Sequence, residues 1–187
     1  MLAYSTLGWF DDPLLSTFIR YPDAQVARLV FHELAHQVVY AKNDTTFNES
    51  FAVTVEDEGV RRWLEAQGRS ADLAAFRTAQ ERKRDLAARI KETRARLKVI
   101  YAMRLTPEQM AEQKKGEFER LRAFYPTIVP SEPNNAFLVS IALYNEYVPA
   151  FERLLAQAGS LDAFYERARK LAHEERTQRD AVLAKSS

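Results

Sequence analysis

Residues 30–37 read VFHELAHQ and, after a short polar break, residues 47–52 read FNESFA. Apolar residues recur at three- and four-residue spacing through the first stretch, which predicts a helix. On that helix His32 and His36 share one face, so both imidazoles can bind the same metal ion. Glu33 is adjacent to them, close enough to take a proton from a metal-bound water. This H-E-x-x-H pattern is typical of a zinc hydrolase site.

Composition narrows the functional classes that remain. The chain has 187 residues, 47% of them hydrophobic, which suits a single domain over residues 1–187 with a substantial core. The net charge is +1, so we expect no nucleic-acid partner. The absence of cysteine excludes disulfides and thiolate ligands. No apolar run reaches the roughly 18 residues that cross a bilayer, so we expect no transmembrane segment in this chain.

The first half of the chain predicts one strand followed by helices. Aromatic and small residues at 3–10, followed by Asp-Asp-Pro, indicate an edge strand, with residues 127–129 as the best candidate for a second strand. A short helix is expected at 13–19. The helix that carries the two histidines is expected from Pro22 to about Lys42, and the next helix from Thr46–Asn48 to just before Gly68.

The middle of the chain predicts a long antiparallel helical hairpin over residues 70–125. Its first helix runs from Ser70 towards Leu105, and Thr106-Pro-Glu-Gln is a strong start signal for the second. The apolar residues expected at the contact are Leu86, Ile90, Leu97, Ile100, Met110, Phe118, Leu121 and Phe124. Acidic residues alternate with the many basic ones, which indicates a solvated face and not a nucleic-acid site. We expect the hairpin to contact another protein or subunit.

The last third of the chain predicts helices separated by clear breaks. One helix is expected from Ala136 through Tyr147, with an interruption at Pro149 before it continues to about Gln157. Gly159 should end it, and Ser160 should cap a last helix whose final turns fray.

A catalytic zinc ion usually has three protein ligands and one open position. His173 lies in a charged helix, where solvation is the ordinary state of a histidine. The acidic candidates for the third ligand are Asp44, Glu49, Glu56, Asp57 and Glu58. Glu49 and Glu56 share a helix face two turns apart, so spacing allows either. Thr46 and Glu49 also have capping-box spacing, which would give Glu49 a purely structural role.

The two stretches together resemble the gluzincin pattern, in which the third zinc ligand is a glutamate in an N-E-x-x-A context. That resemblance selects Glu49, although the linker is shorter than in thermolysin, whose spacing would select Glu56. The stretches at 3–14, at 134–136 and at 148–151, together with Tyr144, further resemble the predicted zinc aminopeptidase family of Gram-negative bacteria. The resemblance implies a mainly α, gluzincin-like metallopeptidase core. We expect the chain to be the C-terminal part of a longer family protein, whose N-terminal segment would give a cell-envelope or periplasmic location.

The expected reaction is hydrolysis of a peptide substrate by one Zn²⁺ ion, with Glu33 as the general base. Tyr144 is the expected donor to the oxyanion, with Tyr147 as the alternative; either tyrosine could equally be a half-buried core residue.

Substrate contacts are expected from two other stretches. The 4–9 strand, with Gly8 and Trp9, could align an extended peptide, and Asn134 and Asn135 could bind its backbone, although turn formation explains both asparagines equally well. An aminopeptidase also needs an acidic group to bind the free amine of its substrate. The candidates are Asp11, Asp12, Glu56 and Asp57.

The alternative from another class is a non-catalytic helical interaction module. In that case the hairpin would bind a partner, and the metal site would be structural or vestigial. Structural zinc sites generally have four protein ligands, mostly cysteine and histidine, whereas two histidines and one carboxylate beside Glu33 indicate an open site.

Overall fold

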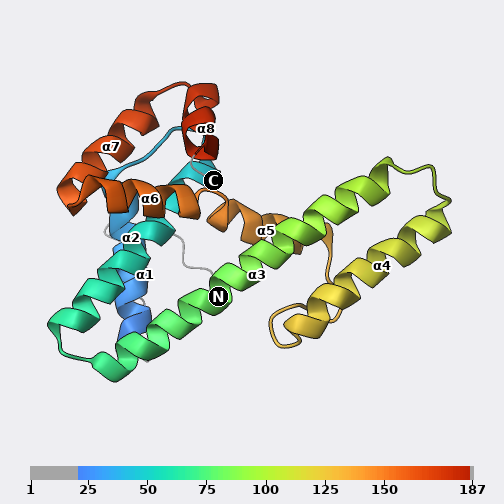
Figure 1. The fold of residues 1–187 in the computed structure, drawn as a ribbon, viewed down its shortest axis with the longest axis horizontal. Helices are drawn as coiled ribbons and strands as arrows, with labels where there is room; N and C mark the ends of the chain where they lie inside the picture. Colours follow the sequence, from blue (N-terminus) through green and yellow to red (C-terminus); the bar gives the residue numbers. More distant parts are fainter. Residues whose placement is uncertain (1–20, 186–187) are drawn as a thin grey trace. The chain divides into compact units, whose positions relative to one another are not determined.

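The computed structural model of the chain describes residues 21–185, and these residues are almost entirely helical (Figure 1). The helices are α1 (Asp23–Val38), α2 (Thr45–Ala66), α3 (Ser70–Ala102), α4 (Pro107–Phe124), α5 (Asn135–Asn145), α6 (Val148–Ala158), α7 (Leu161–His173) and α8 (Arg176–Lys185). The predicted mainly α class is therefore confirmed. Within this part of the chain, no helix is both long enough and apolar enough to cross a membrane.

The expected strands are not among the described residues. The segment at 3–10, with the short helix at 13–19, lies outside them. The prediction of a strand at 127–129 is wrong, because these residues form a turn that continues from the end of α4. The backbone N–H groups of Ile128 and Val129 both donate to the carbonyl of Tyr125, at 3.2 and 2.9 Å, so they are not available to a neighbouring strand.

The chain divides into two compact units. Among the described residues, one unit comprises 21–75 and 143–185, and the other comprises 76–142. The expectation of one metallopeptidase domain over residues 1–187 stays a prediction.

The first unit is built around α2. This helix contacts α1 on one side and α6 on another. Four phenylalanines at its core are fully buried: Phe47, Phe51, Phe151 and Phe164. Phe51 stacks on Phe164 with ring centroids 5.6 Å apart, and Phe47 meets Phe151 edge to face at 5.0 Å. Burial of such large rings is the main stabilising contribution available to a unit of this size.

Helix α1 ends at Val38, four residues earlier than predicted. Val39 is extended (φ −140°, ψ 129°) and buried, and Asn43 adopts a left-handed conformation with φ 61°. Asp44 then caps α2 by accepting a hydrogen bond from the N–H of Phe47 at 3.0 Å. Because Asp44 fills this position, the capping box suggested by the spacing of Thr46 and Glu49 does not form.

The end of α6 and the start of α7 lie at the residues that the sequence predicts. Gly159 (φ 74°) ends α6, and the Ser160 hydroxyl accepts a hydrogen bond from Ala163 N–H at 3.2 Å to cap α7. The prediction of a single last helix is wrong, because α7 ends at His173 and α8 follows it as a separate helix. Fraying of the final turns stays a prediction. Arg179 and Leu183 of α8 are 4% and 2% exposed, so this helix is held by burial of side chains from its inner face.

The second unit contains the expected antiparallel hairpin of α3 and α4 (Figure 1). Its core contains Leu86, Ile90, Leu97 and Ile100 from α3 and Phe118 and Leu121 from α4. Thr106 and Gln109 form the predicted capping box at the start of α4. The prediction for Phe124 is wrong: its ring is 55% exposed, and the Arg89 guanidinium lies 3.8 Å from the ring centroid.

Candidate metal centre

Helices α1 and α2 are in contact where Phe31 meets Gly59. A Cβ atom at Gly59 would be 2.7 Å from the ring of Phe31, so only glycine permits this approach. His32 follows Phe31 directly, and the contact therefore places its imidazole against α2. The contact between Phe31 and Gly59 thus determines which face of α1 is turned towards α2.

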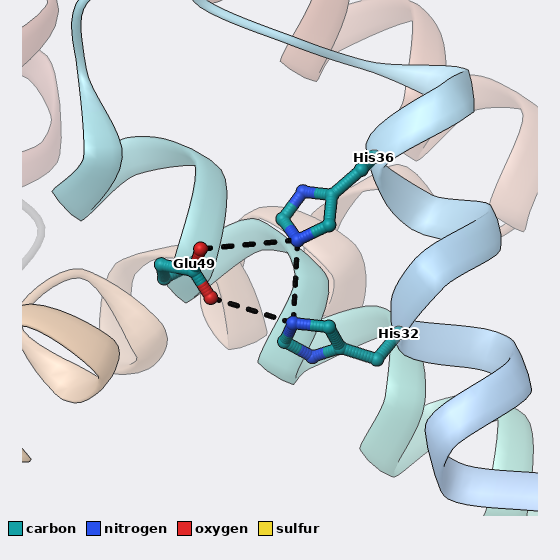
Figure 2. A group of neighbouring side chains, drawn as sticks. All are labelled: His32, His36 and Glu49. Atoms are coloured by element: carbon teal, nitrogen blue, oxygen red, sulfur yellow. Dashed lines mark hydrogen bonds and ion pairs between the residues drawn. The ribbon is translucent and has the colours of Figure 1, made fainter. Parts of the chain in front are cut away.

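Three side chains from these two helices converge on one point (Figure 2). The Nε2 atoms of His32 and His36 are 3.2 Å apart, and the Glu49 carboxylate oxygens lie 3.4 Å from the first and 3.9 Å from the second. Ligands bonded to zinc at 2.0–2.2 Å in tetrahedral geometry are about 3.3–3.6 Å from one another. The observed separations are close to that range, so these side chains fit one face of a zinc tetrahedron.

Glu56 lies on the opposite side of His32 from Glu49. Its carboxylate, 3% exposed, is 2.8 Å from His32 Nδ1 and accepts a hydrogen bond from Arg28 Nε at 2.7 Å. A carboxylate at Nδ1 leaves Nε2 available to a metal and fixes the orientation of the ring. The structure therefore brings Glu49 to the ligand side of the histidine pair and Glu56 to the outer side.

The two imidazoles titrate differently in the absence of metal. Burial lowers the pKa of His32, but hydrogen bonds to Glu49 and Glu56 outweigh it and raise the pKa to about 9. Burial and then the positive charge of His32 lower the pKa of His36. A metal ion binding at Nε2 must consequently displace a proton from this pair.

Glu33 adds a carboxylate close to His36. Glu33 precedes His36 by three residues on α1, so the two side chains are neighbours on the helix surface. Within residues 21–185, no group hydrogen-bonds the buried Glu33 Oε2 or the buried His36 Nδ1. A buried carboxylate oxygen without a partner is destabilising, and such atoms are concentrated where a ligand or a catalytic step needs them.

The linker between α1 and α2 is held by Asn48 and by Asp44, and Asp44 has this structural role in place of the ligand role considered for it from the sequence. The Asn48 carboxamide accepts from the N–H of Ala41 at 2.7 Å and donates to its carbonyl at 2.9 Å. Asp44 forms a buried ion pair with Arg179 of α8 at 2.9 Å. Asn48 immediately precedes Glu49, so its two hydrogen bonds fix the backbone position from which the Glu49 side chain extends.

Several acidic candidates are occupied by other partners. Glu58 accepts hydrogen bonds from Arg61 and Arg62 at 2.6–2.7 Å, and the resulting interactions lower its pKa despite burial. Burial lowers the pKa of Arg28, but the nearby carboxylates of Glu56 and Asp57 outweigh this effect and raise it.

The remaining predicted site residues lie in varied places. Gly8, Trp9, Asp11 and Asp12 are outside the described residues. Asn134 caps α5 by accepting from Phe137 N–H at 3.1 Å, and Asn135 accepts from the Tyr101 hydroxyl at 3.1 Å; both belong to the second unit. These contacts give each asparagine a local structural role, and their contact with substrate stays a prediction.

The two tyrosines considered as donors to the oxyanion lie in different surroundings. Tyr144 lies near the end of α5 and is 38% exposed. The Tyr147 hydroxyl donates to Asp180 at 2.9 Å, and burial together with this hydrogen bond raises its pKa. Its backbone N–H donates to Ser50 Oγ at 3.1 Å. Tyr147 therefore links three helices of the first unit.

Comparison with known proteins gives one result. No curated protein and no solved structure matches the chain significantly. The family described as "Putative aminopeptidase" matches residues 1–183, which is nearly the whole chain. The family resemblance is thereby confirmed at the level of an aminopeptidase family, and a peptidase-like function follows at that coarse level. The chain belongs to this aminopeptidase family.

Proposed function

We propose that the chain is a zinc-dependent peptidase of the gluzincin type, in which His32, His36 and Glu49 hold one Zn²⁺ ion. The observation that carries the proposal is the separation of 3.2–3.9 Å among the three donor groups, which suits a tetrahedral zinc site with one position left for substrate or water. Family membership supports a peptide as the substrate.

A zinc ion held by His32, His36 and Glu49 would supply Lewis acidity to the scissile carbonyl and to the attacking water. Glu33 takes the proton of the attacking water and returns it to the leaving amine. The Glu33 Oε2 atom is buried and has no hydrogen-bond partner among the described residues, which suits a group that must accept a proton during the reaction. Glu56 holds His32 through Nδ1, so the ring presents Nε2 throughout the cycle.

Tyr144 is the proposed donor to the oxyanion. Tyr144 is 38% exposed near the end of α5, so its side chain is accessible from solvent, whereas the Tyr147 hydroxyl donates to Asp180 at 2.9 Å. The proposal predicts that Tyr144→Phe lowers kcat with little change in KM, whereas Tyr147→Phe acts mainly on stability.

Action as an aminopeptidase requires a group that binds the substrate's free amine. Glu56 is a poor candidate because Arg28 and His32 already occupy its carboxylate. The other candidates are Asp57, Asp11 and Asp12, and we propose that one of them fills this role. We also keep Gly8, Trp9, Asn134 and Asn135 as proposed contacts to an extended peptide backbone.

The competing proposal is a non-catalytic helical module with a structural or vestigial metal site. A structural site generally closes the tetrahedron with a fourth protein ligand, and within residues 21–185 the group that could hold a metal comprises only His32, His36 and Glu49. This donor set favours the enzyme.

The deciding experiment measures metal content and peptide hydrolysis in wild type, Glu33→Gln and the control Glu58→Gln. We expect one zinc per chain in all three proteins. Hydrolysis should fall about 10²–10⁴-fold in Glu33→Gln only, because general acid–base catalysis contributes that much. Equal hydrolysis by wild type and Glu33→Gln, with zinc bound, would reject the peptidase proposal.

A second substrate pair separates exopeptidase from endopeptidase action. Wild type should cleave an unblocked leucyl peptide and leave its N-acetylated form intact, because acetylation removes the positive charge that the amine-binding carboxylate recognises. Cleavage of both forms at similar rates would show an endopeptidase.

A further inference from the structure

A groove between α3 and α5 lies entirely within the second unit, with a volume of about 420 Å³. Its apolar part includes Leu97, Leu138 and Val139. Leu97 and Leu138 belong to the unit's core and are 3% and 2% exposed, whereas Val139 is 43% exposed. The groove therefore combines the exposed Val139 side chain with the edge of a packed core, at a volume within the range of known ligand sites.

Three cations of α3 line the same groove: Lys91, Arg94 and Lys98. All three side chains are exposed, and no carboxylate is among the lining residues. Within residues 21–185, none of the three forms an ion pair. Other arginines of α3 do: Arg89 binds Asp85 at 2.9 Å and Arg96 binds Glu117 at 2.6 Å. Positive charge without internal compensation is thus concentrated at the groove.

The spacing of these cations indicates what kind of anion they suit. Residues 91, 94 and 98 follow one face of the helix and extend over about 10 Å of its axis. A single phosphate or carboxylate cannot contact all three, whereas carboxylates repeated along a peptide can. Tyr101 and Asn135 add polar groups to the lining, and Asn135 Oδ1 accepts from the Tyr101 hydroxyl, so the asparagine NH₂ keeps its donor capacity for a peptide carbonyl.

We propose that this groove binds an acidic peptide segment of a partner protein, with carboxylates along Lys91, Arg94 and Lys98 and an aliphatic side chain against Leu97, Leu138 and Val139. Charge complementarity supplies the attraction, and the apolar part of the groove supplies the burial that a flat basic surface lacks. The site is separate from the metal centre in its residues and its chemistry. It needs neither zinc nor catalysis, so it stands or fails independently of the proposed peptidase activity.

The test uses the full chain and a ten-residue peptide of alternating glutamate and leucine, labelled with fluorescein at its N-terminus. The label also removes the free amine that an aminopeptidase would need. A second peptide carries glutamine at every glutamate position. Fluorescence anisotropy gives the Kd of each peptide, at low and at high salt.

Two variants with the same change in net charge are compared. The groove variant combines Lys91→Glu, Arg94→Glu and Lys98→Glu; the control combines Arg82→Glu, Arg104→Glu and Lys115→Glu, three exposed cations outside the groove lining. If the groove variant does not fold, glutamine replaces glutamate at the same three positions. Circular dichroism checks that each variant is folded.

We expect the groove variant to raise the Kd of the acidic peptide about tenfold or more, and the control less than about threefold. Added salt and the glutamine peptide should both weaken binding. The proposal is overturned if wild type does not bind the acidic peptide, or if both variants lose affinity equally. It is also overturned if vesicles of phosphatidylcholine and phosphatidylglycerol bind through the groove while the peptide does not, because the occupant is then a lipid surface.

Discussion

One ion pair of the metal-centre region and one ion pair of the helical hairpin differ sharply in burial. In the first, Asp44 and Arg179 form an ion pair whose side chains are 1% and 5% exposed. In the second, the pair of Asp85 and Arg89 is 51% and 33% exposed, and the cations of the groove have no partner among the described residues. Buried partners fix geometry because leaving either one alone is strongly destabilising, whereas exposed charges leave geometry free and remain available to other molecules.

The largest expected effect comes from Arg179. Arg179→Met leaves the Asp44 carboxylate buried without a counter-charge, and it removes hydrogen bonds to the carbonyls of Ala172 and Glu174. We expect a loss of about 3–5 kcal/mol in the free energy of unfolding. Urea denaturation measures it.

Arg176→Met is the matched control. Its guanidinium is 63% exposed and lies 3.8 Å from Asp180, so the loss should stay below about 1 kcal/mol. Equal losses in the free energy of unfolding for the two variants would show that the buried pair of Asp44 and Arg179 is no more stabilising than an exposed pair.

The next effect concerns Asn48. Asn48→Ala leaves the N–H and carbonyl of buried Ala41 without their partner, which should lower the free energy of unfolding by about 2 kcal/mol or more. Zinc affinity should fall as well, because Glu49 follows directly in the chain. Calorimetry and zinc titration measure the two effects. Unchanged stability would show that water replaces the carboxamide at no cost.

The prediction for Glu56 concerns metal affinity, on which we expect a smaller effect. Glu56→Gln weakens the interaction that holds His32 through Nδ1, and such changes typically lower zinc affinity about 10–100-fold. Competition with a chromogenic chelator measures the change. Glu58→Gln, on the same helix, serves as the control because Glu58 binds Arg61 and Arg62. If Glu58→Gln lowers zinc affinity as much, the loss comes from removing one negative charge and not from the contact of Glu56 with His32.

Local sequence signals were sufficient for much of this molecule. The four-residue interval places His32 and His36 on one face wherever the segment is helical, and the stripe of Leu86, Ile90 and Leu97 predicts the buried side of α3. Caps act over three residues, so Thr106 and Ser160 could be identified directly.

What could not be predicted depends on contacts distant in sequence. Glu49 and Glu56 are seven residues apart and equivalent by helical period; only the offset between α1 and α2 puts them on different nitrogens of His32. Helix α8 depends on a pair between Arg179 and Asp44, which are 135 residues apart. No local pattern contains either fact.

The smallest effects come from two glycines, one in each region, and they should have opposite signs. Gly59→Ala places a Cβ 2.7 Å from the Phe31 ring; overpacking of this kind costs about 1–3 kcal/mol, and the gain of about 0.5–1 kcal/mol from alanine in a helix offsets only part of it. Gly116→Ala meets nothing within 4 Å, so only the gain of about 0.5–1 kcal/mol remains. Thermal unfolding of both variants measures the pair, and stabilisation by Gly59→Ala would show that Phe31 moves aside freely and that the close approach of α1 to α2 does not set the position of His32.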